Sequence, residues 1–341
     1  MKNKLLVVVL ALSLLFCSFL SALADGDKVS IGVLSLLNLS EEDYLNYTKA
    51  RIDVIQYMLK EGAVEILRAG AGNPDDSNIQ IVFYDDLTTM LLGLNAGDIQ
   101  KMEVPQSTAE YLCAMNDMLA MDLKFTNSSI DDFLWVLSNR IGEDYAFMML
   151  EENEALRGDF NAAITSMQED GTLDRLIQEH ITDVISSGEI KPVLPEKKDG
   201  RETLTVAVTG SLPPMDYVAA DGSYTGFSTA VMAEIGKRLD KNIELVTVDS
   251  MGRAAALASG TADVVFWSRT HAGSPLTNSD AKENRASGNE RRKNATEEEK
   301  AIMQSLSDAF PMEKRNARDI PEGTIITNYY YKDIPVTVSL K

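Results

Sequence analysis

One stretch decides the fold of this 341-residue chain: residues 204–239 read LTVAVTGSLPPMDYVAADGSYTGFSTAVMAEIGKRL. Its first five residues have the composition of a short buried strand. Pro213 and Pro214 follow, and neither can donate a backbone hydrogen bond to a sheet, so they end the strand. Asp221 and Gly222 then indicate a turn, and the remainder has the apolar spacing of a helix. The stretch therefore reads as strand, loop, turn and helix.

The same alternation extends through most of the chain. Strands are predicted at 29–35, 79–84, 99–104, 145–150, 204–208, 243–248, 262–267, 324–327 and 334–340, and a strand or short helix at 133–139. Helices are predicted at 40–68, 86–94, 107–121, 152–170, 173–181, 225–239, 253–258 and 296–309. Strands that alternate with helices predict the α/β class, with mainly parallel sheets flanked by helices.

The N-terminus reads as an export signal. Lys2 and Lys4 precede an apolar run at 5–20, and the small residues Ala22 and Ala24 predict cleavage after Ala24. The alternative is a retained membrane anchor, because the apolar run just reaches the length of a short span. Either reading predicts an extracytoplasmic protein, secreted or at the cell surface.

The charge of the chain argues against nucleic-acid binding. The net charge is −20, and residues 1–24 hold two positive and no negative charges, so the remainder carries −22. A surface this acidic repels phosphate backbones. The charge suits a soluble protein that works outside the membrane.

Few side chains suggest catalysis. Past residue 24 the single cysteine is Cys113, which is typical of a small buried hydrophobe, with a reactive thiol as the alternative. The two histidines, His180 and His271, are far apart in the chain, and no metal-ligand spacing, phosphate loop or nucleophile elbow is visible. We predict no catalytic residues, no metal site and no cofactor.

Two segments differ in composition from the rest. Residues 186–202 are polar and contain two prolines and two glycines, so they are predicted to be a linker. Residues 272–323 are dominated by charged and small polar side chains around one helical pattern. This second segment is either a solvated insertion or a docking element.

Residues 204–250 resemble the first lobe of extracytoplasmic solute-binding proteins of the amino-acid type, family 3, with the type II periplasmic-binding-protein-like fold. The likeness lies in the strand, the Pro-Pro loop, the Asp-Gly turn and the Gly-Phe that opens the helix. MGRAAALASGTADVVFW at 251–267 is similar to the next unit of that lobe, and IPEGTIITNYYYKDIPVTVSL at 320–340 resembles its exit through a hinge strand. The resemblance implies a two-lobed protein with a hinge.

The N-terminal half resembles the second lobe of the same family. Residues 29–45 are similar to its opening strand and helix, and 79–112 to its later strand–helix run. Residues 145–181 resemble its return strand and C-terminal helices. The material of the second lobe therefore precedes that of the first.

This order suggests a circular permutant. The alternative is a pair of independent half-modules. Permutation is tolerated where termini lie close together, so it predicts that Val29 and Val338 are near each other. The expected organisation is 1–24 as signal peptide, 25–144 as the lobe resembling the second, 145–185 as return strand and tail helices packing on the other lobe, 186–202 as linker, and 203–341 as the lobe resembling the first, with a polar insertion at 272–323.

A ligand in such a protein lies between the lobes, where the strands end. The candidate wall from one lobe is Leu212, Pro214, Met215, Phe266, Trp267, Ser268, Arg269 and Thr270. From the other lobe the candidates are Leu34, Ser35, Glu103, Gln106 and Ser107. Other roles stay open: strand alternation puts Phe266 in the core, Arg269 is a candidate solvated side chain, and Gln106 and Ser107 also suit a helix N-terminus.

The site departs from the family pattern. Family members carry an aromatic residue at the position of Leu212, an arginine at that of Pro275 and an acid at that of Pro105. Either Arg269 and Glu103 replace these groups from shifted positions, or the ligand is a peptide or a less polar solute, or tight binding is lost.

The resemblance implies a monomeric, secreted binding protein that captures a small solute, such as an amino acid or related compound. Closure about a hinge then presents it to the permease of an ABC importer at the membrane. The alternatives are a sensing or interaction module of the same fold, and a dehydratase or lytic enzyme.

Overall fold

The computed structural model describes most of the chain after the N-terminal segment. The described residues are 28–34, 40–68, 79–125, 137, 141–188, 190–193, 195, 197–219, 221–249, 252–270, 293–309 and 322–341. The predicted signal peptide lies outside them, as does nearly all of the uncertain element at 133–139. Within the described residues, every helix is too short or too polar to cross a bilayer.

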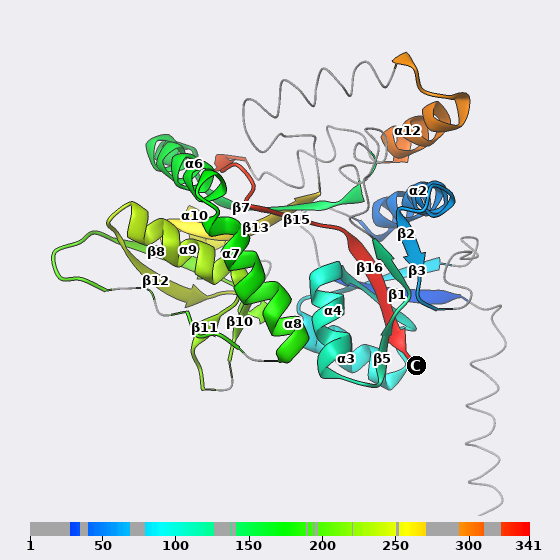
Figure 1. Ribbon diagram of the computed structural model, residues 1–341, viewed down its shortest axis with the longest axis horizontal. Helices are drawn as coiled ribbons and strands as arrows, with labels where there is room; N and C mark the ends of the chain where they lie inside the picture. The colour runs from blue at the N-terminus through cyan, green and yellow to red at the C-terminus, as the bar shows by residue number, and fades with distance from the viewer. Residues whose placement is uncertain are drawn as a thin grey trace, which may run out of the picture.

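The chain forms two α/β lobes that lie side by side (Figure 1). The first lobe has a five-stranded sheet in the order β3-β1-β4-β16-β5. Its strands are β1 (Val29–Leu34), β3 (Ile79–Tyr84), β4 (Lys101–Pro105), β5 (Leu119–Met121) and β16 (Pro335–Leu340), with a separate pair, β2 (Val64–Ile66) and β6 (Leu123–Phe125). Its helices are α2 (Glu41–Lys60), α3 (Leu87–Ala96) and α4 (Gln106–Met115).

The second lobe has the strand order β12-β8-β13-β7-β14, and β15 also pairs with β7. Its strands are β7 (Glu143–Leu150), β8 (Thr203–Val208), β12 (Asn242–Thr247), β13 (Val264–Thr270), β14 (Thr324–Ile326) and β15 (Tyr331–Asp333). A small sheet holds β9 (Ser211–Leu212), β10 (Asp216–Val218) and β11 (Tyr224–Thr225). The helices are α6 (Glu154–Glu169), α7 (Thr172–Ile177), a π-helical turn (Gln178–Thr182), α8 (Asp183–Ser187), α9 (Phe227–Arg238) and α10 (Gly252–Ala258).

The α/β class is confirmed, but both sheets are mixed rather than mainly parallel. In the first lobe β1 pairs in parallel with β3 and β4, whereas β16 is antiparallel to β4 and β5. In the second lobe β8 pairs in parallel with β12 and β13, whereas β7 is antiparallel to β13. The antiparallel members β7 and β16 are strands through which the chain passes between the lobes.

Two helix starts follow from side-chain capping. The Ser40 hydroxyl accepts from the backbone N–H of Asp43 at 3.1 Å, and Asp86 accepts from the N–H of Thr89 at 2.9 Å. Each bond satisfies an N–H that the first helical turn leaves without a partner. These caps explain why α2 and α3 begin where the sequence predicted.

Two predicted helices end too late. The helix expected at 40–68 stops at Lys60, because Gly62 adopts a φ of 75° and turns the chain into β2. The helix expected at 107–121 stops at Met115. There the Asn116 side chain accepts from the N–H of Met118 at 3.0 Å and makes the turn into β5.

The core of the second lobe is built around aromatic rings. Phe147 on β7 stacks on Tyr330 with ring centroids 4.7 Å apart, and it meets Phe160 edge to face at 5.6 Å. The Tyr330 hydroxyl donates to Ser228 at 2.9 Å, so its polar end is satisfied in the interior. Tyr330, which lies far along the chain, is therefore a core residue of this lobe.

Helix α12 (Glu297–Ala309) comes from the polar segment 272–323, yet it packs on α2 of the first lobe (Figure 1). Ile302 and Leu306 are buried in the core of that lobe. The Tyr57 hydroxyl donates to Glu299 at 3.0 Å. Helix α12 is therefore packed against the first lobe, and the two interpretations of the segment as a whole stay predictions.

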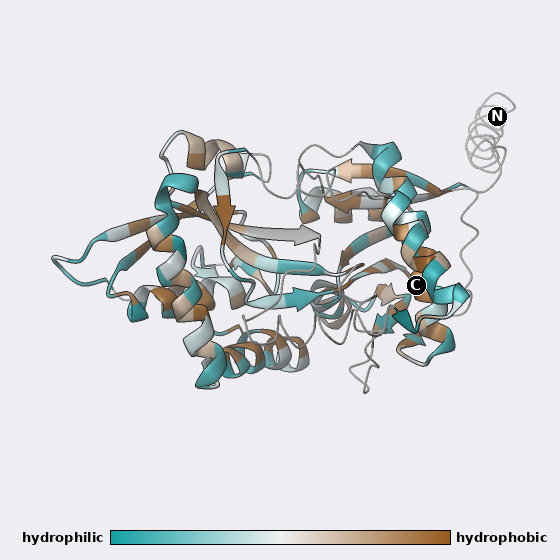
Figure 2. Ribbon diagram, turned by 90° about the horizontal axis from the view of Figure 1, so that it is seen from above, coloured by the Kyte–Doolittle hydropathy of each residue, from teal (hydrophilic) through white to brown (hydrophobic). Residues whose placement is uncertain are grey.

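The two ends of the described chain meet in one sheet. Gly32 of β1 and Val338 of β16 both pair with Met102 of β4, one from each side. Val29 and Val338 thus lie in strands that flank β4, whereas the permuted order itself stays a prediction. Two elements of the range 203–341, α12 and β16, lie in the first lobe. Figure 2 shows the lobes from above.

Candidate ligand-binding site

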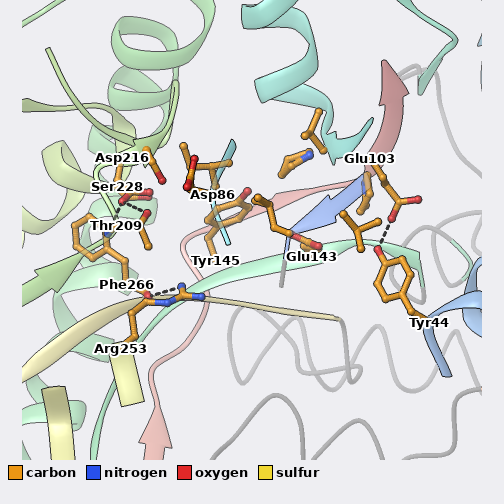
Figure 3. Close-up of a pocket in the computed structure, with 17 residues that line it drawn as sticks. Tyr44, Asp86, Glu103, Glu143, Tyr145, Thr209, Asp216, Ser228, Arg253 and Phe266 are labelled. Atoms are coloured by element: carbon orange, nitrogen blue, oxygen red, sulfur yellow. Dashed lines mark hydrogen bonds between the residues drawn. The ribbon is translucent and has the colours of Figure 1, made fainter. Parts of the chain in front are cut away.

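A cavity of about 90 Å³ lies between the two lobes (Figure 3). The first lobe contributes Leu34, Tyr44, Asp86, Glu103, Pro105 and Pro335, among others. The second lobe contributes Glu143, Tyr145, Thr209, Asp216, Arg253 and Phe266, among others. Several of these residues lie at or just beyond the carboxyl ends of β1, β3, β4 and β8, where α/β folds bind their ligands.

Asp216 organises the loop after β8. Its Oδ2 accepts from the N–H of Thr209 at 3.1 Å, from the Thr209 hydroxyl at 2.9 Å and from the N–H of Gly210 at 2.9 Å. Burial raises the pKa of Asp216, while these hydrogen bonds and the charge of Arg253 oppose the rise. The carboxylate therefore holds the loop against the cavity wall.

Arg253 supplies a cation to the second-lobe wall. Its Nη1 donates to the backbone carbonyl of Phe266 at 3.2 Å. Burial lowers the pKa of Arg253, and the nearby charges of Asp216 and Glu143 act in the opposite direction. Arg253 is thus a guanidinium already oriented by the strand end and by two carboxylates.

Glu103 is anchored from behind by a buried ion pair. Arg51 Nη1 lies 2.6 Å from Glu103 Oε1, and each side chain is only 4% exposed. The Tyr44 hydroxyl donates to the same oxygen, and Arg51 Nη2 donates to the carbonyl of Pro335 at 3.1 Å. Burial and the charge of Glu103 raise the pKa of Tyr44, so its hydroxyl stays protonated as a donor.

Tyr145 lies in the middle of the lining residues drawn in Figure 3. It is 4% exposed, and its hydroxyl is buried with no hydrogen-bond partner within the described chain. Burial, followed by the charge of Glu143, raises the pKa of this hydroxyl. The group is therefore a neutral donor and acceptor that no described residue uses.

Among the expected site residues whose side chains the structure describes, four line the cavity. These are Leu34, Glu103, Leu212 and Phe266. Pro214 and Met215 are buried beneath the wall: Met215 is 0% exposed, and the carbonyl of Pro214 accepts from the N–H of Phe227 at 2.9 Å. They support the loop from the core.

Gln106 and Ser107 begin α4 and bond within the protein. The Gln106 side chain accepts from the N–H of Phe125 at 2.8 Å, so it bonds within the first lobe. The Ser107 hydroxyl lies 3.8 Å from the sulfur of Met215, so it joins the lobes beside the cavity. Neither residue is among those that line it.

The remaining expected residues are described less fully. Ser35 lies outside the described residues. For the run Trp267, Ser268, Arg269 and Thr270 the structure describes the backbone, which continues β13 and pairs with β7 as far as Glu143. The strand was predicted at 262–267, and β13 continues to Thr270, so it ends three residues later than predicted.

Sequence patterns missed several lining residues, namely Tyr44, Asp86, Glu143, Tyr145, Asp216 and Arg253. Asp86 could have been found, because it lies two residues past the end of the strand at 79–84. Tyr44 and Arg253 lie within helical patterns, and nothing local distinguishes them from surface positions. No group of three or more potential metal-binding side chains occurs in the described ranges.

Asp333 joins the lobes next to the cavity. Its Oδ2 accepts from the N–H of Ser107 at 3.0 Å and its Oδ1 from the N–H of Ile334 at 2.8 Å. Burial raises the pKa of Asp333 to about 6. Because the folded state holds the proton more tightly than the unfolded state, the stabilising contribution is complete below pH 4 and is lost as the pH rises through 6.

We expect Asp333→Asn to remove this pH dependence. Between pH 4 and pH 7, the difference in unfolding free energy between wild type and variant should change by about 1–3 kcal/mol, with wild type losing stability relative to the variant. Urea denaturation of both proteins at each pH measures it. A constant difference across this range would show that Asp333 titrates normally.

Residues 204–272 match a protein family, the bacterial extracellular solute-binding proteins, family 3. The match runs from β8 to just past β13, so it includes much of the second-lobe wall. The resemblance predicted for this part of the sequence is confirmed. A comparison with curated proteins finds no significant match.

Solved structures give a weaker likeness. NikA from Staphylococcus aureus, in complex with Ni(L-His)2, is 12% identical and matches over 77% of this chain and 57% of its own, with a TM-score of 0.35. The ligand binding component of an ABC-type import system from Staphylococcus aureus, with zinc bound, is 9% identical. It matches over 92% of this chain and 66% of its own, with a TM-score of 0.36. The VFT2 domain of Bordetella pertussis BvgS is 11% identical and matches over 94% of this chain and 83% of its own, with a TM-score of 0.33.

The chain thus spans less than two thirds of the first two proteins. Likenesses of this size place no ligand or partner on this chain.

Proposed function

We propose that this chain is an extracytoplasmic binding protein that holds a small solute, an amino acid or a related compound, between its two lobes. The observation that carries the proposal is the cavity itself, which has walls from both lobes at the ends of their strands. The family match of residues 204–272 supports it.

The mechanism that suits this geometry is closure about the connections between the lobes. A ligand favours a closed state only through contacts that it makes there and not in an open one. Side chains such as Glu103 and Arg253 face one cavity from opposite lobes, so a solute that touches both would stabilise their approach. The closed protein would then dock, as a monomer, on the permease of an ABC importer.

The size of the cavity restricts the solute. Small-molecule sites usually have volumes of roughly 300–1,000 Å³. The cavity here is about 90 Å³. In this conformation it accepts only a few heavy atoms, so a larger solute requires the lobes to move apart.

The first test is a thermal-shift screen against pools of amino acids, peptides, sugars and amines, followed by calorimetry. At least one pool should raise the melting temperature, because a ligand that binds only the folded state stabilises it. We expect Leu212→Trp, which fills the cavity, to abolish the shift. Leu92→Trp is the matched control, because Leu92 is 63% exposed and lies outside the cavity lining.

Two results would contradict the proposal. Turnover of a bound compound would support an enzyme. No shift with any pool would support a module that signals through contacts with another protein.

A further inference from the structure

The lining of the cavity is acidic. Four carboxylates face it from the described residues, Asp86, Glu103, Glu143 and Asp216, against one guanidinium, that of Arg253. Arg51 lies directly behind Glu103 and is the second cation of the cluster. Among the side chains that the structure describes, and counting both arginines, four carboxylates stand against two guanidinium groups, an excess of two negative charges.

The two arginines are committed to protein groups. Arg51 pairs with Glu103 and bonds to the carbonyl of Pro335. Arg253 bonds to the carbonyl of Phe266 and lies in the field of Asp216 and Glu143. A ligand carboxylate would therefore have to compete with existing partners, and it would enter a region that is already negative.

Asp86 is a lining carboxylate that the protein uses as a helix cap. Its Oδ1 accepts from the N–H of Thr89 as the cap of α3, and within the described ranges it forms no ion pair. It comes from the first lobe, whereas Glu143 and Tyr145 come from the second. In the view of Figure 3, Tyr145 lies between Asp86 and Glu143.

Tyr145 provides an independent indication of a ligand. A buried hydroxyl without a partner has lost its hydrogen bonds to water without replacement, and a ligand that bonds to it removes that penalty. Here the hydroxyl lies at a cavity wall, and its raised pKa keeps it neutral. A neutral hydroxyl accepts a hydrogen bond from an ammonium group and adds no charge of its own.

We propose that the solute is a small organic cation, a primary amine without a carboxylate, whose ammonium group is held between Asp86 and Glu143 and against the Tyr145 hydroxyl. The inference rests on the proposed function and narrows its substrate class. An ammonium carries three N–H donors and one positive charge, which suits two carboxylates and one neutral acceptor.

Calorimetry with matched compounds tests the charge of the ligand. One set is ethanolamine, glycine and glycolate, and a second is 1,4-diaminobutane, 4-aminobutyrate and succinate. Each set keeps the number of carbons and runs from a cation through a zwitterion to an anion. In at least one set we expect affinity to fall from the cation through the zwitterion to the anion, by tenfold or more overall.

Variants of the full chain test the residues. Asp86→Asn keeps the helix cap, because asparagine caps as well as aspartate, and it should weaken binding of the amine at least tenfold. Tyr145→Phe should weaken it about three- to tenfold. The control is Glu298→Gln, since Glu298 is an exposed carboxylate that pairs with Lys60 away from the cavity, and it should leave the affinity unchanged.

The outcomes separate this inference from the proposed function. If glycine, glycolate or another non-cationic solute from the pools binds best, and Leu212→Trp abolishes that binding, the proposal of a cationic ligand is refuted. The proposed binding function then stands. If an amine binds equally well to wild type and Asp86→Asn, the assignment of the ammonium site is overturned. If nothing in any pool binds, both proposals fail.

Discussion

Gly226→Ala is expected to lower the free energy of unfolding by about 3–5 kcal/mol. Gly226 has a φ of 108° and a ψ of 171°, a conformation that is strained for any residue with a Cβ. An added Cβ would lie 2.4 Å from the carbonyl oxygen of Met215 and 2.8 Å from its carbonyl carbon. These are backbone atoms, so no side-chain rotation relieves the contact.

The surrounding hydrogen bonds keep that carbonyl in place. The N–H groups of Phe227 and Ser228, in the first turn of α9, donate to the carbonyls of Pro214 and Met215 at 2.9 and 2.8 Å. Moving either carbonyl would leave a donor of the helix unsatisfied. The Pro-Pro loop, the glycine and the helix therefore form one unit behind the cavity wall.

Chemical denaturation measures the effect, and Gly222→Ala is the matched control. Gly222 also has a positive φ, 83°, but an added Cβ meets nothing within 4 Å. Its replacement should be destabilising by about 1–2 kcal/mol, from the backbone conformation alone. Equal losses in the two variants would mean that the close approach at Gly226 does not occur in solution.

Arg51→Met should be as destabilising, by about 3–5 kcal/mol, because it leaves Glu103 buried without its cation. Both side chains are 4% exposed. Methionine fills much of the same volume, so the main loss is electrostatic. The Tyr44 hydroxyl continues to donate to Glu103, but one neutral donor does not balance a buried charge.

A second substitution isolates the charge. Adding Glu103→Gln to Arg51→Met removes the unpaired carboxylate and should recover at least half of the loss. Lys60→Met is the control, because Lys60 pairs with Glu298 at the surface, where the two side chains are 59% and 56% exposed. We expect no measurable change in the free energy of unfolding. If the double variant were less stable than Arg51→Met, the unpaired charge would not be the cause.

Local patterns located most helices and strands because capping, turn formation and hydrophobic periodicity act over a few residues. The strand predicted at 79–84 is observed with the same bounds. Ser40 and Asp86 cap the helices predicted to begin there, and α12 coincides almost entirely with the helix predicted at 296–309. Where the prediction failed, at Gly62 and Asn116, a single turn residue overrode a longer helical pattern.

The candidate site was less accessible from the sequence. Leu34, Glu103, Leu212 and Phe266 were found because they stand at strand ends or beside the Pro-Pro loop. Arg253 and Tyr145 were missed, since α10 and β7 gave no sign of which residues would face the other lobe. Met215 was assigned to the wall, but its apolar side chain is more favourable in the core.

The sequence by itself determined the α/β class and the order of the elements, because both depend on the chemistry of neighbouring residues. Only the tertiary structure decided that β16 and α12 join the first lobe, that both sheets are mixed and that side chains such as Asp86, Tyr145 and Arg253 face one cavity. Those outcomes depend on contacts between distant parts of the chain, such as the hydrogen bond from Arg51 to Pro335 across 284 residues. A local pattern contains no information about which of several apolar surfaces a strand or helix will cover.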